Sequence, residues 1–154
     1  LGHYDAARTT LRDALTIQDL PSWTRAYALS ALADIDANQG DYPAARARYE
    51  ESLRIERELD DRRGEAATIA QLGWLARQWR KRDDEAFRLY MVAWLLLAPM
   101  GHTQAGTVGN ILNQMAADLG YDKDTVERVV QDVEREYASD GGRGMIDEAL
   151  RDEA

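Results

Sequence analysis

A short phrase recurs three times along this chain of 154 residues. It reads GHYDAARTTLRDAL from residue 2, GDYPAARARYEESL from residue 40 and RKRDDEAFRLYMVAW from residue 80. Each copy spaces a small, a large and a small residue at i, i+4 and i+7: Ala7, Leu11, Ala14; Ala45, Tyr49, Ser52; Ala86, Tyr90, Ala93. This spacing places the three on one face of a helix, where another helix can approach closely.

A second helical pattern lies between these phrases. Leu32, Leu72 and Leu112 stand 40 residues apart, and Gly40, Arg80 and Gly120 follow them by eight residues. Glycine at such a point ends a helix, because it adopts the left-handed conformation without penalty. Asp41, Asp83 and either Asp122 or Asp124 are then expected as N-caps of the next helix. The slot four residues after each leucine holds Asp36, Ala76 and Ala116.

The repeating unit is therefore a helix A, a tight turn and a helix B. We expect helices at 4–19, 22–39, 42–59, 63–79, 83–98, 103–118 and 122–137. The third copy carries one extra residue around RQWRKRDD, so we expect its turn to be distorted. Trp23 is expected to staple the start of the second helix.

The tail changes character after residue 137. ASDGGRG reads as a hinge, and MIDEALRDEA reads as a short acidic amphipathic helix with Met145, Ile146, Ala149 and Leu150 on one side. We expect this helix to cap the last repeat; the alternative is that it lies in a groove of its own chain or of a neighbour. The sequence thus divides into a repeat domain at 1–137 and a hinge with a capping helix at 138–154.

These residues resemble the tetratricopeptide repeat. The resemblance is carried by Leu32–Ala33, Gly40, Tyr42, Ala45, Tyr49 and Ser52, and by Leu72–Gly73, Ala86, Tyr90 and Ala93 in the next copy. It implies an all-α fold, a right-handed α-solenoid of antiparallel helix pairs with about seven helices plus a short C-terminal helix. About three and a half repeats would be present. Their period of about 40 residues exceeds the standard 34 and resembles the long repeats of kinesin light chains and of large bacterial signalling proteins.

Composition narrows the class of protein. The chain is 45% hydrophobic and 31% charged, which indicates a globular domain, and it has no cysteine for a disulfide or a thiolate metal site. A net charge of −9 disfavours nucleic acid as a partner, because phosphate backbones are also negative. The apolar run at 89–98 is too short to cross a membrane. We expect a bacterial, cytoplasmic protein, and a chain that is a fragment truncated at its N-terminal end.

Catalysis finds no support in the residues. His3 and His102 are the only histidines, and neither has a metal-type partner one helical turn away. Motifs such as HExxH and GxSxG are absent, and the acidic residues are spaced to pair with arginines, as in Arg54–Glu58. We therefore predict no enzyme activity, no cofactor and no metal site.

The resemblance implies that the A helices line a concave face where a ligand binds. We predict a polar, amide-rich groove that pairs with an extended peptide or an inserted helix; the alternative is an ordinary solvated face. The groove residues are Tyr27, Asp34, Asn38, Gln71, Trp74, Arg77, Gln78, Asn110 and Gln114. Chaperone-tail clamps use lysine and asparagine in slots that here hold Ser30, Asp34, Ala70 and Trp74, so an acidic chaperone tail is disfavoured.

The predicted function is a non-catalytic protein–protein interaction module from a larger signalling or scaffold protein. It would bind a protein or peptide on the helix-A face, or self-associate as a homodimer through the face of the first helix that carries Leu11 and Leu15. Two alternatives are a receptor for a small signalling peptide and an accessory repeat arm of a multidomain ATPase or regulatory enzyme.

Overall fold

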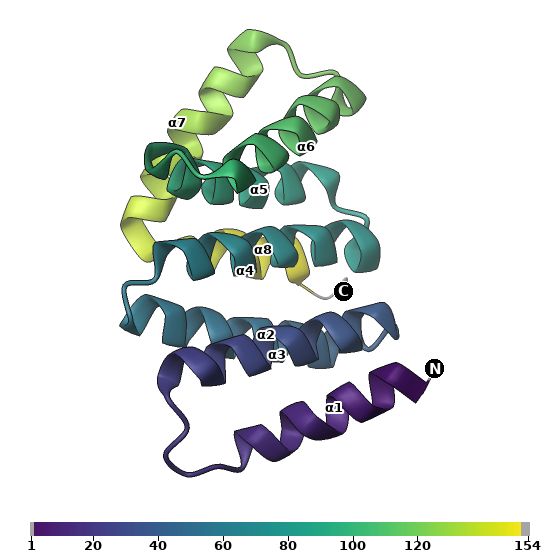
Figure 1. Ribbon diagram of the computed structural model, residues 1–154. Helices are drawn as coiled ribbons and strands as arrows, with labels where there is room; N and C mark the ends of the chain where they lie inside the picture. Colours follow the sequence, from purple (N-terminus) through teal and green to yellow (C-terminus); the bar gives the residue numbers. More distant parts are fainter. Residues whose placement is uncertain (1, 152–154) are drawn as a thin grey trace. The chain divides into compact units, whose positions relative to one another are not determined.

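The computed structural model describes residues 2–151, with side chains from residue 4 onward, and all its regular elements in that range are helices (Figure 1). They are α1 (Gly2–Leu15), α2 (Ser22–Asn38), α3 (Tyr42–Glu58), α4 (Arg62–Leu75), the π-helical turn η1 (Ala76–Arg80), α5 (Asp83–Leu97), the 3-10 turn η2 (Ala98–Met100), α6 (Thr103–Leu119), α7 (Lys123–Asp140) and α8 (Arg143–Leu150). The all-α prediction is confirmed. The chain forms two compact units, 1–68 and 69–154, which are described separately.

Side-chain caps begin several of these helices. Asp41 accepts a hydrogen bond from the Ala44 N–H at 3.3 Å, and Asp122 accepts one from the Thr125 N–H at 2.8 Å, as the sequence predicts. The prediction for Asp83 is wrong by one residue, because Arg82 is the N-cap and Asp83 is the first residue inside α5. Asp83 still favours the helix there, since a negative charge in the first turn complements the helix dipole.

The turns that follow α2, η1 and α6 each contain one residue with a left-handed backbone, but they differ in the span of the hydrogen bond that closes them. Gly40, Lys81 and Gly120 all adopt positive φ, at 81°, 56° and 71°. After α2 and α6 the closing hydrogen bond spans five residues, from Asp41 N to Asp36 O and from Tyr121 N to Ala116 O.

In the π-helical turn the closing bond spans six residues, from Arg82 N to Ala76 O at 3.3 Å. The extra residue predicted in this copy is therefore taken up by the wide π-helical turn. For the same reason the helix end predicted at Arg80 is displaced by one residue to Lys81, the residue with the left-handed backbone.

The first unit is built on the α2–α3 pair. Ala45, Tyr49 and Ser52, the predicted contact face of α3, are almost completely buried, with exposed fractions of 0–1%. Leu15 of α1 packs on the cluster of Ala26, Leu29 and Ile55. The small residues at i and i+7 thus serve the close helix packing that their spacing predicts.

A buried ion group joins α1, α2 and α3. Asp36, whose side chain is 3% exposed, pairs with Arg8 of α1 at 3.0 Å and with Arg48 of α3. This arrangement explains why an aspartate occupies the slot that holds alanine in the other two copies. Two guanidinium groups compensate a carboxylate that would otherwise be costly to bury.

Helix α1 ends at Leu15, four residues before the predicted end. The Arg25 side chain donates hydrogen bonds to the carbonyl oxygens of Leu15 and Ile17, each at 3.2 Å. A helix leaves its last carbonyls without intrahelical partners, so a guanidinium that binds them stabilises the termination at this point.

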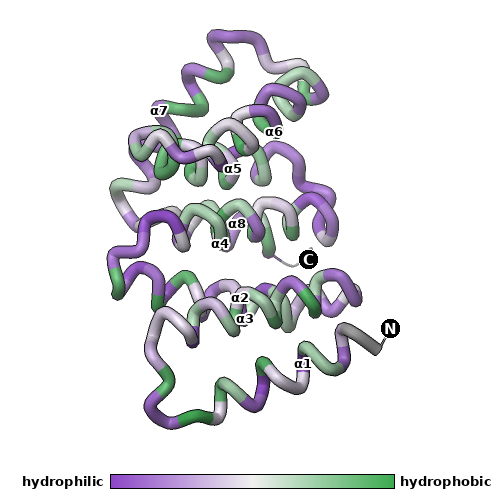
Figure 2. Tube along the Cα trace, in the orientation of Figure 1, coloured by the Kyte–Doolittle hydropathy of each residue, from purple (hydrophilic) through white to green (hydrophobic). Residues whose placement is uncertain are grey.

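Helix α5 is the most buried element of the second unit. Ala86, Tyr90 and Ala93 are 0–5% exposed, in agreement with their predicted role as a contact face. Gly73 lies directly against this face: a Cβ added there would approach Leu89 Cβ at 3.3 Å and the Ala86 carbonyl oxygen at 3.4 Å. Along the helices, hydrophobic and hydrophilic residues alternate as expected for one buried and one exposed side (Figure 2).

The last helix folds back into the second unit. Residues 138–140 are still helical, and the chain turns only at Gly141 and Gly142, both with positive φ. Asp140 fixes this turn, because its carboxylate accepts hydrogen bonds from the N–H groups of Gly142 and Gly144, each at 2.8 Å. Helix α8 then packs against α5, α7 and η1, and its predicted apolar side is the buried one: Met145, Ile146, Ala149 and Leu150.

Candidate functional site

Helix α2 carries a row of exposed and partly buried residues along one side. The row consists of residues spaced at i, i+4, i+7, i+11 and i+15, namely Trp23, Tyr27, Ser30, Asp34 and Asn38. That spacing places them in one row on a helix. Trp23 and Tyr27 are 68% and 71% exposed, Ser30 and Asp34 are partly buried, and Asn38 is exposed. We call this row the α2 stripe.

Asp34 is the only charged residue of the α2 stripe. Its Oδ1 accepts a hydrogen bond of 2.6 Å from the Tyr49 hydroxyl of α3. Burial raises the pKa of Asp34, and the bond from Tyr49 partly opposes that rise. The Asn38 amide donates to the Asp34 carbonyl oxygen at 2.8 Å and so remains within its own helix.

A buried polar network lies beside the stripe in the same unit. The Ser30 hydroxyl contacts that of Ser52 at 2.9 Å, and Ser52 contacts Glu56 Oε1 at 2.9 Å. Thr68 also bonds Glu56 Oε1, at 3.0 Å. Burial raises the pKa of Glu56, the bonds from Thr68 and Ser52 lower it, and the charges of Asp61 and Glu65 raise it.

The second unit holds the other predicted groove residues, on α4, η1 and α6. On α4 and η1, Gln71 and Gln78 are exposed, whereas Trp74 and Arg77 are partly buried. Arg77 pairs with Asp83 at 2.8 Å. On α6, Asn110 and Gln114 are exposed, and Gln114 donates to Asp118 one turn later at 2.9 Å.

The predicted groove is therefore divided between the two units. Tyr27, Asp34 and Asn38 share the α2 stripe, and the remaining six residues belong to the second unit. Each of the nine residues is exposed or partly buried. That a ligand binds there stays a prediction.

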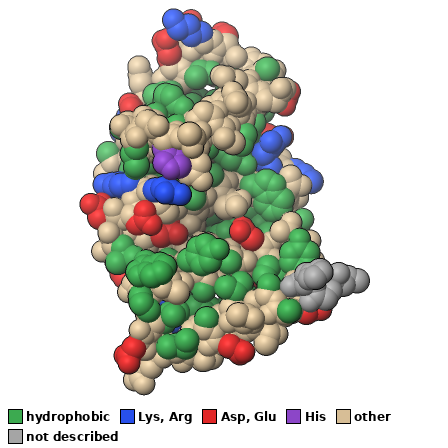
Figure 3. Space-filling view, viewed as in Figure 1, with side chains coloured by type: hydrophobic (Ala, Val, Ile, Leu, Met, Phe, Trp, Pro, Cys, Tyr) green, Lys and Arg blue, Asp and Glu red, His purple; other side chains and the backbone are tan. Residues whose placement is uncertain are grey.

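Trp23 was not predicted as part of the groove. A staple would bury its ring, yet the side chain is 68% exposed, so the expectation that it fastens the start of α2 is wrong. Its position four residues before Tyr27 was the signal in the sequence. Figure 3 shows hydrophobic side chains gathered on the viewed face of the first unit.

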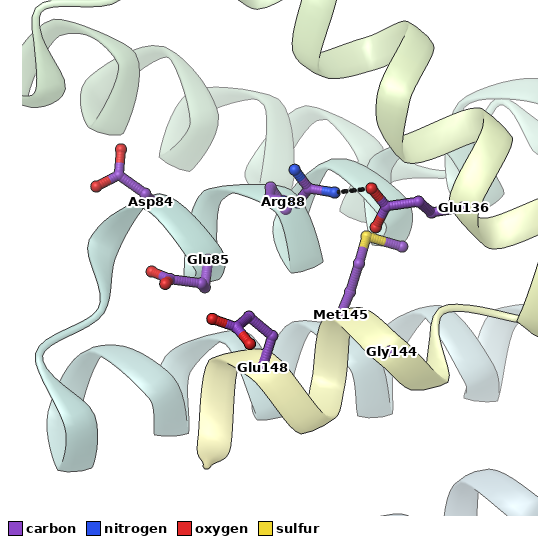
Figure 4. A pocket seen from close by; sticks show the side chains of 7 residues that line it. All are labelled: Asp84, Glu85, Arg88, Glu136, Gly144, Met145 and Glu148. Carbon is purple, nitrogen blue, oxygen red and sulfur yellow. Dashed lines mark ion pairs between the residues drawn. The ribbon is translucent and has the colours of Figure 1, made fainter. Parts of the chain in front are cut away.

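Two pockets of the second unit were also missed. One, of about 380 Å³, lies between α5, α7 and α8; Glu85 and Glu148 are among the residues that line it, and Arg88 pairs there with Glu136 at 2.6 Å (Figure 4). The other, of about 300 Å³, is apolar, and Phe87, Trp94 and Leu112 are among its lining residues. The first could not be foreseen from repeats, because it depends on the path of the non-repeating α8.

The described part of the chain holds neither a cluster that could bind a metal ion nor a helix that could span a membrane. Between residues 4 and 151, no group of three or more histidine or acidic side chains is placed to hold a metal ion. His102 serves as a helix cap, with Nδ1 accepting from the Gln104 N–H at 3.2 Å. None of the described helices combines the length and the apolar character that a membrane span requires.

Comparison with known proteins gives one match. Residues 24–93 match the sequence model of the tetratricopeptide repeat family. No curated protein and no solved structure matches the chain. The matched segment begins in α2 and ends in α5, so it contains the two copies in which the repeat pattern is most complete.

Proposed function

We propose that this chain, a tetratricopeptide repeat protein, binds an extended peptide or a helix of another protein on the accessible sides of its A-type helices. Tetratricopeptide repeats are in general protein-interaction modules. The observation that carries the proposal is the α2 stripe, which leaves two aromatic side chains mostly exposed beside a partly buried carboxylate. Aromatic side chains at the centre of an interface often supply much of the binding energy.

The second unit supports the proposal with a different surface. Gln71, Gln78, Asn110 and Gln114 offer amide groups on α4, η1 and α6. An amide both donates and accepts, so it can pair with the backbone of an extended segment. The role of the module within a larger bacterial signalling or scaffold protein is part of the proposal, and a small signalling peptide fits the same description of the ligand.

A pull-down from a cell extract tests this function. The full chain serves as bait, with Tyr27→Ala and Asn110→Ala as variants of the A-type helices. Glu51→Ala, on the exposed side of α3, is the control. We expect proteins captured by the wild type to be reduced at least fivefold by one of the two variants and retained by the control. A set of captured proteins that neither variant changes would contradict the proposal.

A further inference from the structure

We propose that the apolar pocket between α5, α6 and α7 binds one aromatic side chain of the partner segment, and that the Trp94 indole N–H donates a hydrogen bond to the backbone of that segment. The inference rests on the proposed function, because it assumes that a peptide or helix binds this chain, and it adds the anchor residue of the ligand. The pocket lies entirely within the second unit.

The walls of this pocket are mostly apolar and uncharged. It has a volume of about 300 Å³, and α6 and α7, which supply two of its walls, both pack on α5. Phe87 and Met91 of α5 are 1% and 4% exposed, whereas Val126 and Val130 of α7 are partly buried. None of the described residues that line the pocket is charged. A charged group would lose its hydration there without compensation, so the ligand group is a neutral one.

The other helix pairs fill the seam between helix A and helix B with a tyrosine of their own. Tyr49 of α3 is 1% exposed, and its hydroxyl bonds Asp34 of α2 at 2.6 Å. Tyr90 of α5 is 5% exposed, and a Cβ added at Gly73 of α4 would lie 3.4 Å from its ring. In both pairs an aromatic ring of helix B thus lies against helix A.

The last helix pair lacks this ring. Tyr49 and Tyr90 each stand nine residues after the left-handed residue of their turn, which is Gly40 or Lys81. The same count from Gly120 reaches Val129, so a smaller side chain takes the place of the tyrosine. An aromatic ring supplied by a ligand would therefore add to this pair the kind of group that the others contain.

Two polar groups at the pocket can hold the backbone of such a ligand. Trp94 Nε1 would lie 3.4 Å from a Cβ added at Gly109, and among the described residues no acceptor bonds its N–H. Because Gly109 has no side chain, this donor stays open to a ligand carbonyl. Asn113 also lines the pocket and follows Asn110 by one helical turn, so the pocket adjoins the amide-bearing side of α6.

The lining groups favour an aromatic guest over an aliphatic one. The rings of Phe87 and Trp94 can meet another ring edge to face, and the Met91 thioether makes favourable contacts with aromatic rings. Helix α6 has no charged residue between positions 103 and 117. Binding at this site should therefore change little as salt is added, because salt screens interactions between charges.

Selection from a random library of displayed peptides on the full chain tests this inference. We expect the enriched peptides to share a phenylalanine, tyrosine or tryptophan. A synthetic peptide of the enriched sequence should bind more weakly, by about fivefold or more, to Val130→Phe, whose ring would occupy the pocket. Gly109→Ala should have the same effect, because its Cβ would stand against the Trp94 N–H. Filling a cavity commonly preserves or raises stability, so thermal denaturation should show that both variants are folded.

A second measurement reports on the indole directly. The N–H signal of Trp94 in an NMR spectrum, assigned by its loss in Trp94→Phe, should move when the synthetic peptide binds the wild type. The peptide with its aromatic residue replaced by alanine should leave the signal in place. If Val130→Phe does not fold, Gly109→Ala and this signal decide.

Matched controls separate the pocket from general effects. Gly106→Ala makes the same change in the same helix, where the added Cβ meets no atom within 4 Å, and it should bind the peptide like the wild type. Enriched peptides without an aromatic residue, unchanged binding by folded Gly109→Ala and Val130→Phe, or a Trp94 signal that does not move would overturn the inference. If only Asn110→Ala or Tyr27→Ala weakens binding, the proposed function stands and this inference fails. The absence of any enriched peptide would contradict both.

Discussion

The Tyr49 hydroxyl and the Asp34 carboxylate are joined by a hydrogen bond of 2.6 Å that links the buried seam of the first unit to its accessible stripe. Tyr49 is 1% exposed, whereas Asp34 is partly buried. Burial and this bond both raise the pKa of Tyr49, so the tyrosine remains a donor at any physiological pH. The carboxylate is thereby held in one orientation.

Removal of the Tyr49 hydroxyl should lower the stability of the fold and change the pKa of Asp34 in the α2 stripe. In Tyr49→Phe we expect the free energy of unfolding to fall by about 1 kcal/mol, the usual contribution of one hydrogen bond. The pKa of Asp34 should rise, because the bond that lowers it is lost. Chemical denaturation and an NMR titration of Asp34 measure the two effects. Tyr27→Phe, which removes an exposed hydroxyl, should change neither; a similar loss of stability in both variants would contradict the prediction.

Glu56 should make the stability of the first unit depend on pH. Its pKa is raised in the folded state, so the folded chain binds a proton more tightly than the unfolded chain. Stability is therefore lost as pH rises through the folded pKa, and it is regained as pH falls toward the unfolded value of about 4.3. Urea denaturation between pH 4.5 and about 8 measures how the free energy of unfolding changes with pH. A variant that lacks the Glu56 carboxylate is needed for comparison, because other carboxylates contribute to the same pH dependence.

Glu56→Gln supplies that comparison. No donor among the described residues reaches Glu56 Oε2, so the ionised side chain is incompletely satisfied. We expect the variant to be more stable than the wild type near pH 8, by about 1 kcal/mol, and to have a smaller pH slope. Glu58→Gln is the control, because Glu58 is 62% exposed and pairs with Arg54 at the surface. A slope equal to that of the wild type in Glu56→Gln would refute the assignment.

Removal of the Asp36 carboxylate should lower the free energy of unfolding. Asp36→Ala leaves Arg8 and Arg48 close together without their shared carboxylate. We expect it to lower the free energy of unfolding by about 3 kcal/mol, whereas Asp13→Ala on the exposed side of α1 should change it by less than about 0.5 kcal/mol.

A triple variant, Arg8→Met with Asp36→Ala and Arg48→Met, should recover most of that loss, because an apolar replacement of the whole group leaves no buried charge. Thermal or urea unfolding reports both steps. A triple variant no more stable than Asp36→Ala alone would show that the ion group contributes more than charge compensation.

Two glycines of the second unit should respond to alanine in opposite directions. A Cβ at Gly73 would lie 3.3 Å from Leu89 Cβ and 3.4 Å from the Ala86 carbonyl oxygen, so we expect Gly73→Ala to cost about 2 kcal/mol by overpacking. A Cβ at Gly106 in α6 would meet no atom within 4 Å, so Gly106→Ala should add about 0.5–1 kcal/mol through helix propensity. Thermal denaturation of both variants measures the two changes in stability. A stabilising Gly73→Ala would contradict the prediction, because it would mean that Leu89 and the Ala86 backbone move to make room for the added Cβ.

Self-association through α1 remains a proposal that can be checked in solution. Tyr4 is 46% exposed, Ala7 is exposed and Leu11 is only partly buried. If this side forms a homodimer, light scattering at high concentration should give twice the mass of one chain, and Leu11→Asp should return it to one. A single-chain mass for the wild type at millimolar concentration would reject the dimer.

The sequence predicts the repeating parts of this molecule well, because repetition is a property that the sequence itself displays. The leucines at a spacing of 40 and the glycines that follow them locate α2, α6 and their turns to within a residue or two. The residues Tyr27, Asn38, Asn110 and Gln114 lie on accessible sides for the same reason, since helical register follows from the buried leucines.

The parts that could not be predicted depend on contacts between distant segments. Asp36 is paired by residues 28 and 12 positions away, and nothing in a helical pattern indicates which arginine will reach it. The position of α8 is fixed partly by Arg82, whose guanidinium donates to the Glu148 carbonyl oxygen at 2.6 Å across 66 residues. The exposure of Trp23 likewise depends on the path of the chain before α2, which follows no repeat.

The wide turn at Ala76–Arg80 has a consequence for how this chain tolerates changes in length. One surplus residue has been absorbed by local winding, and Ala86 and Tyr90 still reach their buried positions in α5. The helix that follows such a bulge still presents the same residues to the core. Natural or designed insertions at this point can therefore change the spacing of surface side chains without disrupting the packing of the residues that follow.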